Sequence, residues 1–202
     1  MPTKHVVKQY DAPAFYHIYN RASGERPLFR DGVDRLVFLE FIAKHLLEND
    51  NPEDQVKTYP VQIVAYCLMG THFHLLVYQY DDPAAITGFM RSVGTAYSMH
   101  YNSKYKSKGH VFQSSYRASH VNNDAYLAHI TRYIHLNPRN YKTWDWSSYP
   151  HYLGQKYRYD WIHPELVLDD AELGSRYEKF VEDYATVNRR EMAAELQDSL
   201  AI

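Results

Sequence analysis

Two spacings of apolar residues predict a mixed α+β protein. Alternating apolar and polar residues predict strands, because side chains two apart in a strand share a face. Apolar residues three and four apart predict helices. The expected strands are residues 15–20, 58–69 and 72–80, with residues 111–121 either strand or irregular. The expected helices begin near Asp31, at Pro83 and at 122–124, and end by Pro52, near Tyr101 and before Pro138.

The order of these elements favours a small antiparallel sheet with helices packed on it. Met69-Gly70-Thr71 predicts a hairpin between the second and third strands. The composition then changes, since residues 160–202 carry eleven acidic and four basic residues, whereas residues 1–159 carry 18 basic and 13 acidic. We therefore predict a domain over residues 1–158 and an acidic, mostly helical C-terminal appendage over residues 159–202, with helices near 170–184 and 189–200.

Cysteine content and hydropathy indicate the cellular compartment in which the protein is expected. The chain has one cysteine, Cys67, so no disulfide can form within it. No stretch approaches the roughly 18 apolar residues that a membrane span needs. The first residues also lack a run of signal-peptide type. We therefore expect a cytoplasmic protein with no membrane partner.

The net charge of −2 hides an uneven distribution. No Asp or Glu occurs between Pro83 and Asn123, although basic residues do. A basic stretch without acids is typical of a polyanion-binding surface, and a solvated loop has the same composition. Tyrosines interleave with these cations and can stack unpaired bases, or else pack at the edge of the core. The basic residues concerned are Arg91, Lys104, Lys106, Lys108 and Arg117.

Two histidines stand out in the third expected strand. His72 and His74 are two apart, so they share one face of the strand, with Phe73 on the other. Two adjacent imidazoles can hold one divalent metal ion. Two surface histidines would give the same pattern.

A second polar pair ends the third expected helix. Tyr133 and Asn137 are four apart and share a helix face. If this face lies beside His72 and His74, two imidazoles and one amide oxygen can bind a cation and leave positions open for substrate oxygens. A tyrosine beside such a metal can act as a nucleophile toward a phosphodiester. A core tyrosine with a satisfied hydroxyl is the alternative reading.

Short motifs follow one another between Tyr16 and Tyr149. They are Tyr16-His-Ile-Tyr-Asn-Arg21, Cys67-Leu-Met-Gly-Thr-His-Phe-His-Leu-Leu-Val77, Phe89-Met90-Arg91, Gly109-His-Val-Phe-Gln-Ser-Ser-Tyr-Arg117, Tyr126-Leu127, Arg132-Tyr-Ile-His-Leu-Asn-Pro138 and Trp144-Asp-Trp-Ser-Ser-Tyr149. In order and spacing they resemble the HUH single-tyrosine transposases, in particular the REP-associated tyrosine transposases (IS200-like). Members often have a proline shortly before the first histidine, where this chain has Gly70-Thr71, which affects the turn more than metal ligation.

The resemblance implies a ferredoxin-like sheet and a metal-dependent enzyme. Family members bind Mg²⁺ or Mn²⁺ and cut single-stranded DNA next to a hairpin. Their tyrosine forms a 5′-phosphotyrosine link and frees a 3′-hydroxyl, which can rejoin strands. By position, His72, His74 and Asn137 become metal ligands and Tyr133 the nucleophile. The resemblance also implies a monomer or a homodimer, as both occur among relatives.

Residues around this centre are candidates for DNA contacts, because amides and cations bind phosphates and bases. Three other functions remain open: a domesticated protein that binds hairpin DNA without cutting it, a relaxase or replication-initiator nuclease, and an RNA-binding ferredoxin-like domain. The acidic appendage either covers the basic face or packs elsewhere. The candidate DNA-binding residues are Asn20, Arg21, Arg91, Lys104, Lys106, Lys108, Gln113, Arg117 and Arg132.

Overall fold

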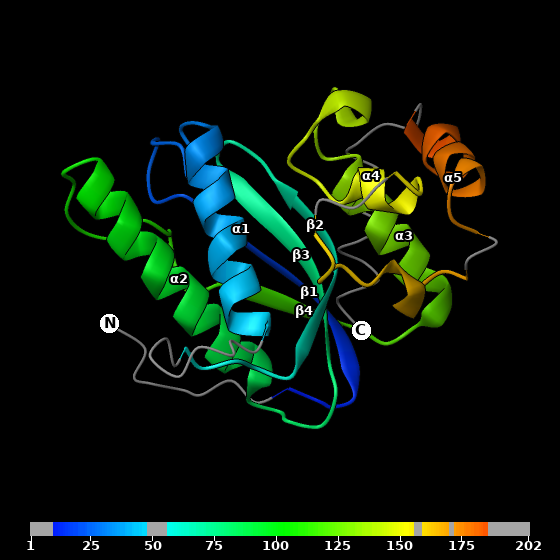
Figure 1. Cartoon of the computed structure of the whole chain (residues 1–202), viewed down its shortest axis with the longest axis horizontal. Helices are drawn as coiled ribbons and strands as arrows, with labels where there is room; N and C mark the ends of the chain where they lie inside the picture. The colour runs from blue at the N-terminus through cyan, green and yellow to red at the C-terminus, as the bar shows by residue number, and fades with distance from the viewer. Residues whose placement is uncertain (1–9, 48–55, 156–158, 170–171, 186–202) are drawn as a thin grey trace.

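The centre of the protein is a four-stranded antiparallel sheet (Figure 1). The computed structural model describes residues 10–47, 56–155, 159–169 and 172–185. The spatial order of the strands is β2-β3-β1-β4, which differs from their order in the chain. The strands are β1 (Ala14–Arg21), β2 (Val61–Leu68), β3 (His72–Gln79) and β4 (Arg117–Val121).

Helices cover both faces of this sheet (Figure 1). Helices α1 (Gly32–Leu46) and α2 (Ala85–Lys104) lie on one face. The other face carries α3 (Asp124–His135), α4 (Tyr149–Tyr152) and α5 (Ser175–Ala185), with short 3-10 turns at Tyr141–Thr143 and Pro164–Leu166. The predicted fold class, an antiparallel ferredoxin-like sheet with helices packed on it, is confirmed.

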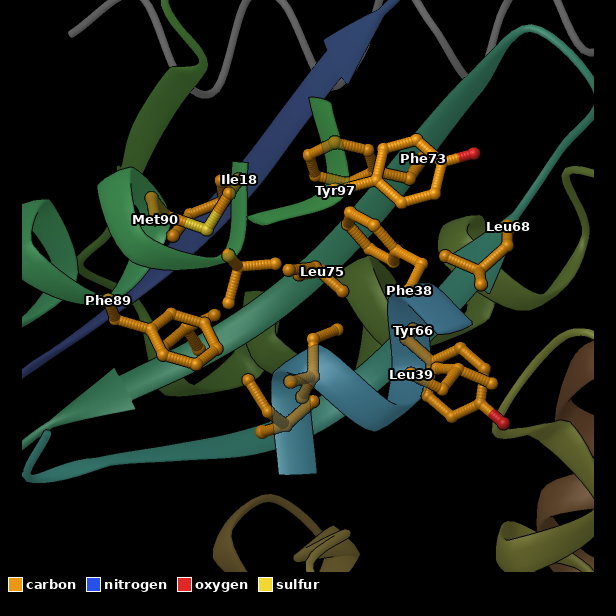
Figure 2. Close-up of a cluster of buried hydrophobic side chains, with 14 of the residues drawn as sticks. Ile18, Phe38, Leu39, Tyr66, Leu68, Phe73, Leu75, Phe89, Met90 and Tyr97 are labelled. Atoms are coloured by element: carbon orange, nitrogen blue, oxygen red, sulfur yellow. The ribbon is translucent and has the colours of Figure 1, made fainter. Parts of the chain in front are cut away.

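The larger core lies between the sheet and the pair α1 and α2 (Figure 2). Ile18 of β1 and Phe73 and Leu75 of β3 pack there against Phe38 of α1 and Phe89 of α2, and all five are buried. Side chains alternate along a strand. Because Phe73 and Leu75 face this core, the neighbouring residues of β3 face the opposite layer.

A second core lies on that opposite face. Leu76 of β3 packs with Ile130 and Ile134 of α3, and with Tyr177 and Val181 of α5. All five side chains are 1% exposed or less. This core therefore fixes how α3 lies over the sheet.

Several boundaries differ from the predicted ones. Helix α1 begins as expected, since Asp31 caps it by accepting a hydrogen bond from the Asp34 backbone N–H at 2.8 Å. The second strand begins at Val61 rather than near residue 58, because the backbone of Tyr59 bonds to the end of α1 and its ring packs beneath α2. Helix α2 extends past Tyr101 to Lys104, which was expected in a loop.

The region before β4 and the C-terminal segment also differ in detail. Only residues 117–121 form a regular strand, while Phe112 makes a single bridge to Ala22. Helix α5 begins at Ser175, not near residue 170. The helix expected at 189–200 lies outside the described residues.

The described part of the acidic segment packs on the rest of the protein. Ile162 bridges Ile63 of β2, and Trp161 joins the larger core. Tyr177 and Val181 join the second core. The predicted division at residues 158 and 159 stays a prediction. Among the helices that the structure describes, none combines the length and the apolar character that crossing a membrane requires.

Candidate active site

Two neighbouring strands place four rings on the sheet face that α3 covers. His72 and His74 project from β3, and His17 and Tyr19 project from β1. Tyr19 and His74 are direct partners in the antiparallel register. The His17 and His74 rings lie nearly parallel, with centroids 5.1 Å apart at 17°, and the Tyr19 ring stacks on His17 at 5.2 Å. The expected shared face of His72 and His74 is therefore found.

The end of α3 brings Tyr133 and Asn137 to these rings. Asn137 Nδ2 donates to the Tyr133 backbone carbonyl at 3.1 Å, which holds the pair on one side of the helix end. Asn137 Oδ1 lies 3.4 Å from Nε2 of His72. The Tyr133 ring packs edge-on against His74, with centroids 5.5 Å apart. The four residues selected from two separate motifs thus converge.

Burial determines the protonation states of His72, His74 and Tyr133. Burial lowers the pKa of His72, against a smaller opposing effect of the hydrogen bond with Asn137. Burial, with smaller effects from His17 and His72, also holds the pKa of His74 well below its usual range. Both imidazoles are therefore neutral at pH 7 and keep a ring-nitrogen lone pair. Burial raises the pKa of Tyr133, which keeps its hydroxyl protonated, while the Asn137 side chain opposes that shift.

The donor set fits a divalent cation. Two ligands of one cation at about 2.1 Å lie roughly 3.0 Å apart in an octahedral site and about 3.4 Å apart in a tetrahedral one. The distance between His72 Nε2 and Asn137 Oδ1 is in this range. No cluster of three His, Cys, Asp or Glu side chains suited to a metal occurs in the part of the chain that the structure describes. The candidate set differs from such a cluster, since an amide oxygen joins two imidazoles.

Comparison with known proteins identifies the family. The sequence model of the IS200-like transposases matches residues 16–137, which include all four of these residues. The chain belongs to the IS200-like transposase family. The similarity inferred from the motifs is thereby confirmed.

A solved structure supports the fold of this transposase. It is the REP-associated tyrosine transposase bound to a REP hairpin, which superposes with a TM-score of 0.59 over 75% of this chain and 86% of that one. The two sequences are 13% identical, so the likeness concerns the fold. No significant match to this transposase is found among curated proteins.

A cavity of about 980 Å³ opens beside the two histidines. Four of the candidate DNA-binding residues line it together with His72 and His74. Its wall is tied together by polar contacts, since Arg21 Nε donates to Gln113 Oε1 and Asn20 Nδ2 donates to the Ser114 carbonyl at 3.1 Å. We call this space the site cavity; the four candidates in its lining are Asn20, Arg21, Gln113 and Arg117.

A second groove of about 1080 Å³ runs beside α2, and we call it the α2 groove. Arg91 lines it, and so do residues of the segment 109–116. The two spaces share four residues of their lining, so they adjoin. None of the described residues lining either space is Asp or Glu. The shared residues are Asn20, Phe73, Gln113 and Ser114.

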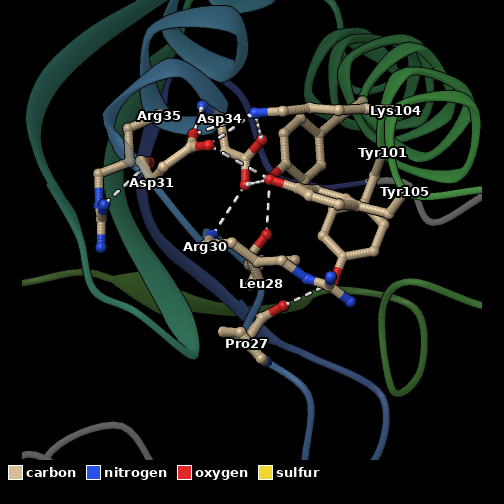
Figure 3. A network of polar contacts seen from close by, with 10 residues as sticks. Pro27, Leu28, Arg30, Asp31, Asp34, Arg35, Tyr101, Lys104 and Tyr105 are labelled. Atoms are coloured by element: carbon tan, nitrogen blue, oxygen red, sulfur yellow. Dashed lines mark hydrogen bonds and ion pairs between the residues drawn. The ribbon is translucent and has the colours of Figure 1, made fainter.

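Lys104, which the sequence suggests as a DNA-binding residue, lines neither the site cavity nor the α2 groove. Its ammonium lies 2.7 Å from Oδ1 of Asp34 and 2.9 Å from Oδ2 of Asp31, at the start of α1 (Figure 3). Tyr105 donates to Asp34 beside it. The positive charge of Lys104 is therefore engaged in joining α2 to α1. Lys106 and Lys108 follow it on the exposed loop and line neither space.

Arg132 is also engaged within the protein. It is 6% exposed, and its guanidinium lies over the rings of Phe180 and Tyr184 at 4.2 and 3.7 Å. Arg132 therefore holds α5 against α3, and its contact with DNA stays a prediction. The two motif residues Tyr133 and Arg132 are adjacent in sequence but face different environments.

Sequence reasoning missed His17. This residue is 4% exposed, and burial lowers its pKa to about 4. The motif Tyr16-His-Ile-Tyr-Asn-Arg21 was recognised, but no role was given to its histidine. The alternation of β1 places His17 and Tyr19 on one face, and this was the signal available in the sequence.

Proposed function

We propose that this transposase is a metal-dependent nuclease and strand transferase for single-stranded DNA next to a hairpin. The observation that carries the proposal is the convergence of His72, His74, Asn137 and Tyr133, with His72 Nε2 3.4 Å from Asn137 Oδ1 and the Tyr133 ring against His74. Family membership supports the same chemistry. His72, His74 and Asn137 hold Mg²⁺ or Mn²⁺, and Tyr133 is the nucleophile.

Tyr133 carries out the covalent step. Its hydroxyl oxygen attacks the phosphorus, the bond between phosphorus and the 3′-oxygen breaks, and a 5′-phosphotyrosine link forms. The phenolic proton leaves to solvent, and the departing 3′-oxygen takes up a proton to become a hydroxyl. That hydroxyl can attack the link in the reverse direction, so rejoining needs no other energy source. The cation, when bound, polarises the phosphoryl oxygens and stabilises the developing charge.

The adjoining site cavity and α2 groove suit a single strand. Carboxylates would repel the phosphates of a DNA backbone, so a lining without them suits a bound strand. Cationic and amide side chains can bind phosphates and bases. Arg21 and Arg117 lie at the site cavity and Arg91 at the α2 groove. We assign DNA contacts to these arginines together with Asn20 and Gln113. The fold relative bound to a REP hairpin supports hairpin DNA as the class of partner.

A covalent-adduct assay tests this function. The protein is mixed with labelled single-stranded oligonucleotides carrying the hairpin repeats that flank its gene, with Mn²⁺ or with EDTA, and run on a denaturing gel. We expect an adduct with Mn²⁺ that is absent with EDTA and absent in Tyr133→Phe. Tyr126→Phe is the matched control, since Tyr126 lies on the same helix and stacks on His129 instead.

The outcomes separate the alternatives. An adduct that survives in Tyr133→Phe assigns the nucleophile to another residue. Tight binding of the hairpin DNA without any adduct supports the domesticated DNA-binding protein instead. Binding of RNA hairpins that is insensitive to EDTA, again without an adduct, supports an RNA-binding domain.

A further inference from the structure

His17 is a buried polar residue that the proposed reaction leaves without a role. Its Nε2 lies 2.9 Å from Nδ1 of His74. The two residues are 57 positions apart and come from neighbouring strands β1 and β3. The near-parallel rings and the stacked Tyr19 hold this arrangement, because each ring restricts the rotation of the next.

The hydrogen bond between the two histidines has a defined consequence for His74. A neutral imidazole carries one proton, so one ring nitrogen donates and the other keeps its lone pair. If Nδ1 of His74 is already used toward His17, Nε2 is the ring nitrogen left to bind a cation. Nε2 has a lone pair only when the proton is on Nδ1, and that proton then needs an acceptor. Nε2 of His17 is at hydrogen-bond distance to be this acceptor.

The opposite assignment is unfavourable for ligation. If His17 donated instead, His74 would carry its proton on Nε2, which would block that nitrogen. In the ligating arrangement the proton of His17 is on Nδ1, which has no hydrogen-bond partner among the described residues. In metal-binding histidines generally, the ring nitrogen that does not bind the metal donates its proton to a hydrogen-bond acceptor, which fixes both the tautomer and the ring orientation. Nε2 of His17 would be that acceptor for His74.

We propose that His17 is a positioning residue whose Nε2 accepts the Nδ1 proton of His74 and thereby keeps His74 Nε2 free to bind the metal ion. This inference rests on the proposed function, because it assumes a cation at His72, His74 and Asn137. It assigns no contact between His17 and DNA. The effect of His17 is therefore on metal affinity before any DNA is present.

The test measures Mn²⁺ binding to the DNA-free protein by titration calorimetry. His17→Phe and His17→Leu remove the acceptor, and His17→Phe keeps an aromatic ring for stacking. We expect both to weaken Mn²⁺ binding by about tenfold to a hundredfold, the usual effect of removing a hydrogen-bond partner of a metal ligand. His17→Gln keeps an acceptor oxygen near the position of Nε2, so it should bind Mn²⁺ within a few-fold of the wild-type protein.

Thermal unfolding distinguishes a structural role. If His17→Phe unfolds at a lower temperature but binds Mn²⁺ as tightly as wild type, His17 supports the fold alone and the inference is overturned. The inference also fails if His17→Gln loses as much affinity as His17→Phe and His17→Leu. His72→Ala reports on the metal site itself. Unchanged binding in His72→Ala would count against the proposed function, whereas weakened binding there with no effect in the His17 variants would count against the inference only.

Discussion

Nε2 of His72 lies 3.4 Å from Oδ1 of Asn137, although 65 residues separate the two in sequence. His72 belongs to a strand, whereas Asn137 follows the end of α3. The second core places α3 over the sheet, through Ile130, Ile134 and Leu76. The geometry of the candidate metal site therefore depends on how α3 packs on the sheet, and the affinity of the site for a cation should depend on the same packing.

Replacing Asn137 tests the third ligand. Asn137→Ala removes the amide oxygen beside His72 and also the hydrogen bond to the Tyr133 carbonyl. We expect Mn²⁺ binding, measured by calorimetry, to weaken by about tenfold or more. Asn140→Ala is the matched control, because Asn140 lies three residues further on and is exposed. Equal affinities of the two variants would remove Asn137 from the ligand set.

All four proposed catalytic and metal-binding residues come from one chain, so a single copy should be sufficient for cleavage. Neither His72→Ala nor Tyr133→Phe should form the covalent adduct alone. We expect a mixture of the two variants to form none either, because neither copy then has both His72 and Tyr133. Adduct formed by the mixture at a sizeable fraction of the wild-type yield would show that Tyr133 acts on a strand bound at the partner copy's metal site.

Local spacing predicted much of the fold and the centre of the site. The two-residue spacing of His72 and His74 and the four-residue spacing of Tyr133 and Asn137 each fix a shared face, and these rules need no tertiary information. That the two faces meet is only a condition in the sequence argument, since the apolar residues of α3 do not say which strand they pack on. The distance between them does not follow from the spacing either, because it depends on packing between Leu76 and α3.

Long-range contacts engage two of the cations that the sequence assigns to DNA. Lys104 was assigned to DNA on local charge, but its partners Asp31 and Asp34 lie 73 and 70 residues earlier. Arg132 packs on Phe180, whose backbone carbonyl also accepts from it across 48 residues. A count of charges along the chain cannot distinguish a cation paired in this way from one that faces solvent.

The lysines of this region are therefore expected to separate by function. A double variant, Lys106→Met with Lys108→Met, removes both exposed charges. The logarithm of its binding constant for single-stranded DNA should fall less steeply with the logarithm of salt concentration, with a slope smaller in magnitude by about 1.4, since each phosphate contact contributes about 0.7. Lys104→Met should leave that slope close to the wild-type value, because its charge is paired with Asp31 and Asp34.

Lys104→Met should instead lower the urea concentration at the unfolding midpoint. The carboxylate of Asp34 is fully buried, and its remaining hydrogen-bond donors among the described residues would be the Arg30 backbone N–H and the Tyr105 hydroxyl. The Lys106 and Lys108 double variant should unfold near the wild-type midpoint, as both residues are exposed. A salt slope that changes only in Lys104→Met would place the DNA contact on that residue and contradict this division.

Two glycines of α2 give a matched test of the packing beneath that helix. A methyl group at Gly88 would meet the Tyr59 ring, with Cδ1 at 2.9 Å, and this ring is held by a 2.8 Å hydrogen bond to Ser92. Gly88→Ala should therefore lower the free energy of unfolding by about 1–3 kcal/mol, as overpacking does. At Gly94 the nearest atom is Phe112 Cε2 at 3.8 Å, an ordinary contact. Gly94→Ala should raise that free energy by up to about 1 kcal/mol through helix propensity. Urea unfolding of both variants measures the difference, and a stabilising Gly88→Ala would mean that Tyr59 can move away from the helix.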